Sequence, residues 1–304
     1  MKRIAAVVLA VALAAGVFAA WSLAASSGGK GAAKLTRVTK LPPLPAEVKK
    51  RKRWVIGVKC DFPPFGYIDV RGNNDGYDVA VARRFAQLAF GRANRAILVC
   101  VTTPSRIPAL TSNRVDIIIS TLTWTASRAQ QIDFSIPYYS ATGRLLVPNN
   151  SSITSAKDLG GKNVVTTRGA LYATWVRNCF KNTNLLEVDG TAAAVLAVKD
   201  GRADTFMFDD AFVLGVATQD RDLKLTTDKF LSVPWGIGIR KGDAVTKRWV
   251  DAAIRRMKAR DEFVKILRNN VPKKYIGSFL DNVPRPKNNF AYPVGKDPTA
   301  ECPS

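Results

Sequence analysis

Polar side chains follow directly after a short apolar stretch near the middle of the chain. Residues 115–119 read Val-Asp-Ile-Ile-Ile, a β-branched run that is typical of a strand covered on both faces. Thr123, Thr125 and Arg128 come next, and open α/β sheets bind ligands just past the carboxyl ends of their strands. The Arg128 guanidinium presents a rigid fork of donors that suits a carboxylate. The Thr123 hydroxyl and the backbone N–H groups of the turn can share the same anion, so the sequence predicts an anion-binding site.

Residues 120–139, STLTWTASRAQQIDFSIPYY, resemble the polar amino-acid family of periplasmic solute-binding proteins, which serve ABC importers. The family pattern is (S/A)-x-(M/L)-T-x-T-x-x-R…(V/I)-D-F-(S/T)-x-P-Y. The matching residues are Ser120, Leu122, Thr123, Thr125, Arg128, Ile132, Asp133, Phe134, Ser135, Pro137 and Tyr138. In that family the arginine and the first threonine clamp the α-carboxylate of the ligand. The resemblance assigns these roles to Arg128 and Thr123 and includes Thr121 in the ligand site. On residue type alone, Arg128 would read as a solvated arginine at a helix start.

The resemblance covers roughly residues 54–283. Asp61-Phe62-Pro63-Pro64-Phe65 is similar to the family loop D-x-x-(Y/F)-P-P-F, in which an aromatic ring stacks on the ligand. Phe62 is the candidate for that ring, and Asp61 is included in the predicted site, although the loop here is shorter than usual. Asp78 follows a glycine turn and is predicted to be a helix N-cap.

Arg106 lies in the motif R-I-P-x-L, which occurs in a branch of the family that includes glutamate and aspartate binders. It either faces the side chain of the ligand or lies away from it, and both readings remain open.

Two segments further along the chain contribute the remaining candidates. Arg168-Gly169-Ala170 stands where relatives usually carry glycine followed by threonine or serine. The resemblance assigns Gly169 to the carboxylate site, and Ala170 removes the usual hydroxyl. Arg168 either adds charge or points to solvent. Asp209 ends an apolar strand, and in the family the aspartate here pairs with the α-ammonium of the ligand. A buried carboxylate needs such a partner.

The implied architecture is an α/β protein with the type II periplasmic-binding fold, in which two α/β lobes are joined by two hinge strands. The predicted domains are lobe 1 at residues 54–142 and 235–283, lobe 2 at residues 143–234, and an irregular C-terminal tail at residues 284–304.

The amino-terminal segment combines a basic start with an apolar, alanine-rich run. Residues 1–25 are expected to be a signal peptide, with an uncleaved anchor as the alternative because the run approaches the roughly 20 residues that span a bilayer. Residues 26–53 are rich in lysine, arginine and proline and read as a disordered linker. The protein is therefore expected in the periplasm or another extracytoplasmic space, free or tethered to the membrane.

Composition narrows the classes of function. The chain has 304 residues and a formal net charge of +22, of which residues 1–53 carry +10 through eleven basic residues and the acid Glu47. The remaining +12 is scattered and no nucleic-acid-binding motif is present, so nucleic acid is not an expected partner. The absence of histidine excludes histidine-based acid–base catalysis and most zinc sites. No metal or organic cofactor is expected.

An exported chain can form disulfides. Its four cysteines, Cys60, Cys100, Cys179 and Cys302, allow three pairings. The strands that carry Cys60 and Cys100 are neighbours in the related family, so the resemblance implies that these two pair and leaves Cys179 with Cys302. Four buried free thiols are the alternative.

The sequence thus predicts a monomeric solute-binding protein that captures a polar amino acid between its lobes and delivers it to a membrane permease of an ABC importer. Arg106 and Arg168 favour an acidic side chain on the ligand. The alternative is an enzyme on the same fold that is similar to cyclohexadienyl dehydratases.

Overall fold

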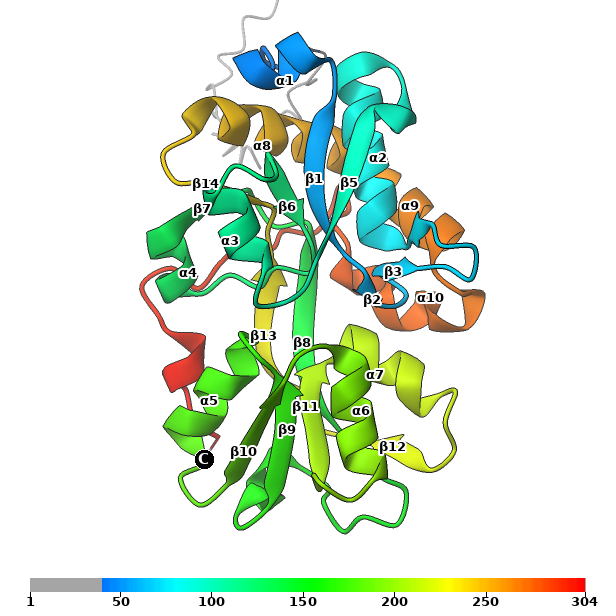
Figure 1. Ribbon diagram of the computed structural model, residues 1–304, viewed down its shortest axis with the longest axis vertical. Coiled ribbons are helices and arrows are strands. Elements are labelled where there is room, and N and C mark those ends of the chain that lie inside the picture. Colours follow the sequence, from blue (N-terminus) through cyan, green and yellow to red (C-terminus); the bar gives the residue numbers. More distant parts are fainter. Residues whose placement is uncertain (1–39, 304) are drawn as a thin grey trace, which may run out of the picture. The chain divides into compact units, whose positions relative to one another are not determined.

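The computed structural model describes residues 40–303, which form two α/β lobes joined by two long strands (Figure 1). Each lobe contains its own sheet, and helices pack against it. The two connecting strands are β8 (Tyr139–Pro148) and β13 (Phe230–Trp235), which pair antiparallel. This arrangement confirms the predicted type II periplasmic-binding fold.

The sheet of lobe 1 has the strand order β5-β1-β6-β14-β7. Its strands are β1 (Trp54–Lys59), β5 (Ala96–Val101), β6 (Ile117–Ile119), β7 (Ile132–Phe134) and β14 (Gly238–Arg240). A small sheet beside it contains β2 (Asp61–Phe62), β3 (Gly66–Ile68) and β4 (Asn74–Asp75). The helices are α2 (Tyr77–Phe90), α3 (Arg106–Thr111), α4 (Ala126–Gln131), α8 (Ala244–Ala259), α9 (Glu262–Asn270) and α10 (Lys273–Phe279), with 3₁₀ turns at Ala93–Arg95 and Leu280–Asn282. β1 pairs parallel with both β5 and β6, so their carboxyl ends meet at one edge of the sheet.

The sheet of lobe 2 has the order β10-β9-β11-β8-β12, and β13 also pairs with β8. The strands not yet given are β9 (Asn163–Thr167), β10 (Asn184–Val188), β11 (Thr205–Asp209) and β12 (Leu223–Leu225). The helices are α5 (Leu171–Cys179), α6 (Thr191–Lys199) and α7 (Asp210–Ala217), with a 3₁₀ turn at Ala156–Leu159. All residues of β11 are buried, in keeping with the apolar sequence between Thr205 and Asp209.

The hinge region is rigidified by aromatic packing. Tyr139 at the start of β8 pairs with Trp235 at the end of β13, and their rings stack with centroids 4.4 Å apart. Thr123 also forms a bridge with Trp235. The candidate anion site is therefore attached directly to the strands that join the lobes.

The prediction of a disordered linker at residues 26–53 is wrong for the part that the structure describes, residues 40–53. Residues 46–51 form helix α1 (Ala46–Arg51), in which Val48 is buried. Arg51 donates to both carboxylate oxygens of Asp116, at 2.7 and 2.8 Å. The apolar side chains between the charges thus pack on lobe 1, which a composition argument overlooks. The predicted signal peptide at residues 1–25 and residues 26–39 lie outside the described residues. None of the helices among residues 40–303 has the length and hydropathy that spanning a membrane requires.

Both predicted disulfides are present. Cys60 pairs with Cys100 between neighbouring strands of lobe 1, and Cys179 at the end of α5 pairs with Cys302. The tail that carries Cys302 is irregular, as predicted, apart from a 3₁₀ turn at Pro298–Ala300. In Figure 1 the tail, drawn in red, runs along one flank from lobe 1 to α5 in lobe 2.

Candidate functional site

Arg128 is buried at the interface between the lobes. The residue is 8% exposed, and Nη1 donates to the Thr123 carbonyl at 2.6 Å, whereas Nη2 reaches across to the Gly169 carbonyl of lobe 2 at 2.8 Å. Thr125 caps the helix that carries it, because its hydroxyl accepts from the Arg128 N–H. Burial, together with the nearby Arg106, lowers the pKa of Arg128 to about 9, so the guanidinium is still charged at neutral pH.

Arg106 is a second buried guanidinium beside the first. Its Nη1 donates to the carbonyls of Ser120 and Thr121, at 2.7 and 3.1 Å. Burial lowers its pKa to about 10. Among residues 40–303, neither Arg106 nor Arg128 has a carboxylate within ion-pairing distance. Two buried cations that lack a paired anion are costly, and an anion bound between them would offset that cost.

Lys59 adds a third cation, at the carboxyl end of β1. The residue is 1% exposed, and its ammonium donates to the Thr103 hydroxyl at 3.0 Å and lies 2.8 Å from the Asp61 carboxylate. Burial lowers the pKa of Lys59, although Asp61 opposes this effect. Asp61 is also a point of contact between the lobes, since its carbonyl accepts from the Thr191 hydroxyl at 2.5 Å.

Asp209 faces these cations from lobe 2. Its carboxylate accepts from the Tyr172 hydroxyl at 2.8 Å. Burial raises the pKa of Asp209 to about 7, and the hydrogen bond from Tyr172 and the fields of Arg106 and Arg128 act in the opposite direction. The Asp209 carboxyl therefore titrates near neutral pH and would ionise more readily next to an added cation.

The predicted N-cap role of Asp78 is wrong. Gly76 occupies the N-cap position of α2, and Asp78 lies fully buried within the first turn. Its carboxylate accepts from the Thr121 N–H at 2.8 Å. Thr121 has φ of +48°, a conformation that non-glycine residues rarely adopt. Asp78 thus helps to hold the unusual backbone turn whose carbonyls orient Arg106.

The structure brings most of the predicted site together around one cavity. Residues from both lobes line it: Thr103, Arg106, Thr121, Thr123, Arg128, Ala170, Leu171, Tyr172, Phe208 and Asp209. The cavity has a volume of about 10 Å³, which admits about one water molecule. An amino acid can therefore enter only after the lobes separate.

Three predicted residues stand beside the cavity rather than on its surface. Phe62 is buried among aromatic rings and packs on Phe208 with centroids 5.6 Å apart. Gly169 has φ of +75° and offers its carbonyl to Arg128. Asp61 reaches the site through Lys59. Arg168 is exposed and pairs with Asp189 at 2.9 Å, and it is not among the residues that line the cavity.

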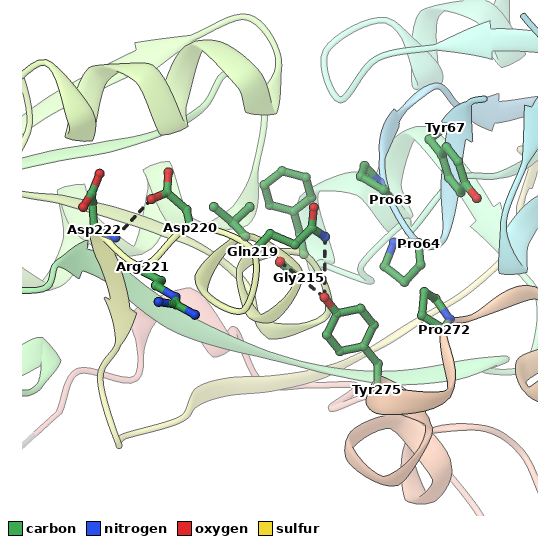
Figure 2. A pocket seen from close by; sticks show the side chains of 12 residues that line it. Pro63, Pro64, Tyr67, Gly215, Gln219, Asp220, Arg221, Asp222, Pro272 and Tyr275 are labelled. Atoms are coloured by element: carbon green, nitrogen blue, oxygen red, sulfur yellow. Dashed lines mark hydrogen bonds between the residues drawn. The ribbon is translucent and has the colours of Figure 1, made fainter. Parts of the chain in front are cut away.

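A larger cavity of about 650 Å³ lies elsewhere between the lobes (Figure 2). Pro63, Pro64 and Tyr275 line it from lobe 1, and the chain around Gln219 lines it from lobe 2. The Tyr275 hydroxyl lies 2.6 Å from that of Thr218. None of the three buried cations contributes to this cavity. Its charged lining residues are Asp220, Arg221 and Asp222, of which Arg221 and Asp222 are exposed, so it offers no buried charge to an amino-acid backbone.

Sequence reasoning missed Lys59, Tyr172 and Thr103. A lysine that ends an apolar strand beside a ligand-site loop was a usable signal for Lys59, because a charge at that position lies at the binding edge of the sheet. Tyr172 and Thr103 had no comparable signal, since each reads as an ordinary helix or loop residue.

The geometry agrees with comparisons to known proteins. The model of the bacterial extracellular solute-binding proteins, family 3, matches residues 54–273. The ABC transporter glutamine-binding protein GlnH of Bacillus subtilis is 31% identical over 247 residues, which cover 80% of this chain and 90% of that protein. The glutamine-binding protein of Geobacillus stearothermophilus is 36% identical over 197 residues, covering 64% and 75% of the two chains.

Among solved structures, the cysteine-binding protein from Campylobacter jejuni has a TM-score of 0.71 at 32% identity. The match covers 74% of this chain and 91% of that one. The family match extends across both lobes and includes every residue assigned above to the cavity. The chain therefore belongs to the bacterial extracellular solute-binding proteins of family 3.

Proposed function

We propose that this protein captures a free amino acid between its lobes, with Arg128 and Thr123 holding the α-carboxylate and Asp209 holding the α-ammonium. The observation that carries the proposal is a buried guanidinium and a buried carboxyl on opposite lobes, which line the same cavity. A zwitterion supplies the anion that Arg128 lacks and a cation for Asp209, so each desolvated charge meets its opposite.

The placement of these charges also couples binding to closure. Arg128 belongs to lobe 1 and Asp209 to lobe 2, so an amino acid held by both bridges the lobes and favours the closed form. We assign supporting roles to Thr121 and Gly169, whose backbone positions Arg106 and Arg128. Phe62 is assigned to the aromatic wall behind the ligand, through Phe208.

The side chain of the ligand is proposed to be polar, with an acidic group favoured. Arg106 and Lys59 remain on the lobe 1 side after the α-carboxylate has been assigned to Arg128, and both are buried. Asp61 partly neutralises Lys59, so the oxygen of a side-chain carboxamide is the alternative to a carboxylate as the ligand group that Arg106 and Lys59 bind. No carboxylate lies within ion-pairing distance of Arg106 among residues 40–303, although the fields of Asp209, Asp61 and Asp78 raise its pKa, so Arg106 favours the carboxylate.

We propose further that the closed, loaded protein is a monomer that delivers its ligand to the permease of an ABC importer outside the cytoplasm, after export by an N-terminal signal. The relatives described above are named as binding proteins, and GlnH is named as part of an ABC transporter. This supports a binding role and gives no support to the dehydratase alternative.

The test is calorimetric titration of the purified protein with the common amino acids, after bound ligand has been removed by unfolding and refolding with the disulfides intact. We expect one or a few amino acids to bind, and Arg128→Ala to weaken binding by about a hundredfold or more, because it removes one partner of a buried charge pair. Arg168→Ala is the matched control, since Arg168 is an exposed arginine on the neighbouring loop. An absence of binding across the panel, or equal binding by Arg128→Ala, would overturn the proposal.

A further inference from the structure

The C-terminal tail is attached to both lobes. On lobe 1, the Tyr292 ring stacks on Trp124 with centroids 5.8 Å apart, and its hydroxyl donates to the Ser135 carbonyl at 2.7 Å. On lobe 2, the Trp175 indole donates to the Glu301 carbonyl at 2.9 Å, and Cys302 is bonded covalently to α5 through Cys179. The tail is therefore a third connection between lobes that are otherwise joined by β8 and β13.

The segment between the two attachments is short and exposed. Residues 294–297 are exposed, whereas Pro298 and Thr299 are buried again on lobe 2. The backbone bonds within the segment are local turns, from Val294 N–H to Tyr292 and from Lys296 N–H to Pro293. Six Cα–Cα steps separate Tyr292 from Pro298, so the fully extended segment reaches about 20 Å. Because of these turns the segment is shorter than its extended length and can lengthen, but not beyond about 20 Å.

The tail also lies next to the contact that must break when the lobes separate. A cavity beside Arg128 and Gly169 is lined by Asp297 and Thr299 of the tail as well as by residues of both lobes. Any motion that draws Gly169 away from Arg128 thus also draws Thr299 away from the attachment of Tyr292. The cavity at the candidate site is too small for an amino acid in the closed arrangement, so such a motion is required for ligand entry.

We propose that residues 284–303 form a strap that limits how far the lobes open, and that the Cys179–Cys302 disulfide fixes its end on lobe 2. Opening extends the segment between Tyr292 and Pro298 until it is straight, and the covalent bond then prevents further separation. Without the bond, only hydrogen bonds and packing would hold the end of the tail on α5. The proposal concerns the ligand-free protein and does not depend on which ligand is bound.

The test is the radius of gyration of the ligand-free protein, measured by small-angle X-ray scattering. Cys179→Ser combined with Cys302→Ser should increase it by about 1 Å over a value of about 19 Å expected for a compact chain of this size. Cys60→Ser combined with Cys100→Ser is the matched control, because that disulfide lies within lobe 1, and it should leave the radius unchanged.

A second variant keeps every cysteine and both attachments. Inserting Gly-Ser-Gly-Ser between Gly295 and Lys296 lengthens the strap by up to about 14 Å and should cause a similar increase. If the disulfide variant fails to fold, the insertion alone decides the question. A radius unchanged from the parent protein in the insertion variant would overturn the proposal, and so would an equal increase in the lobe 1 control.

Discussion

Replacing Asp209 with asparagine should change how the stability of the ligand-free protein depends on pH. Burial raises the pKa of Asp209 from its ordinary value of 3.8 to about 7. Between these values the folded chain retains the proton and the unfolded chain has released it, so a rise in pH favours unfolding. The contribution of Asp209 to stability is therefore fully present below about pH 4 and is lost as the pH rises through 7.

The magnitude follows from the same values. A carboxyl whose pKa is raised from 3.8 to about 7 is about 4 kcal/mol harder to ionise in the folded chain than in the unfolded chain. Asparagine retains an oxygen that can accept from Tyr172 but cannot ionise. Relative to the parent protein, Asp209→Asn should therefore gain as much as about 4 kcal/mol of unfolding free energy between pH 4 and pH 8.

The assay is urea unfolding of both proteins at several pH values with the disulfides intact. Groups that are common to the two proteins, including Asp78 with its similarly raised pKa, cancel in the difference. Asp158→Asn is a control whose stability should change with pH in the opposite direction. Hydrogen bonds from Thr154 and Ser155 lower the pKa of Asp158, so the ionised Asp158 stabilises the parent protein only above that pKa. A difference between parent and Asp209→Asn that does not vary with pH would refute the assignment of Asp209 as a desolvated group.

Three further perturbations follow from the structure. Lys59→Met removes a buried cation that we propose to lie beside the ligand side chain. Titration calorimetry should show about a tenfold or larger loss of affinity for an acidic amino acid and a smaller loss for a neutral one. Tyr172→Phe removes the hydrogen bond that opposes the rise in the pKa of Asp209, so the midpoint of the pH dependence of ligand affinity should move upward; an unchanged midpoint would contradict this role. Val48→Ala should destabilise the protein by about 1 kcal/mol in urea unfolding, because Val48 is the buried residue of α1. Glu47→Ala, at an exposed position of the same helix, is the control, and equal stability of the two variants would show that α1 does not pack on lobe 1.

The sequence predicted the parts of the site that depend on a local motif. Thr123 and Arg128 come after β6, and Asp209 is the last residue of β11. A position at or past the end of a strand fixes which edge of the sheet a side chain lies on. The structure places all three on one cavity. Their roles toward a ligand remain proposals.

The errors and omissions arose where tertiary contacts override local patterns. Asp78 has the local signature of a helix N-cap, but its carboxylate accepts a hydrogen bond from the N–H of Thr121, which is distant in the sequence. Residues 40–53 have the composition of a linker, yet a few apolar side chains and the pair between Arg51 and Asp116 hold them on lobe 1. Tyr172 matters only because α5 presents it to Asp209, which no spacing along the chain reveals.

The central claim is that the protein recognises both charges of a free amino acid. The most direct measurement is calorimetric titration with the best-binding amino acid, its N-acetyl derivative and its α-carboxamide. If Arg128 and Asp209 bind the two charges, each blocked compound should bind at least about a hundredfold more weakly than the free amino acid. In Asp209→Asn, the difference in affinity between the free amino acid and its N-acetyl derivative should become smaller, whereas the difference between the free amino acid and its α-carboxamide should not change. Equal affinity for the free and blocked compounds would contradict the account.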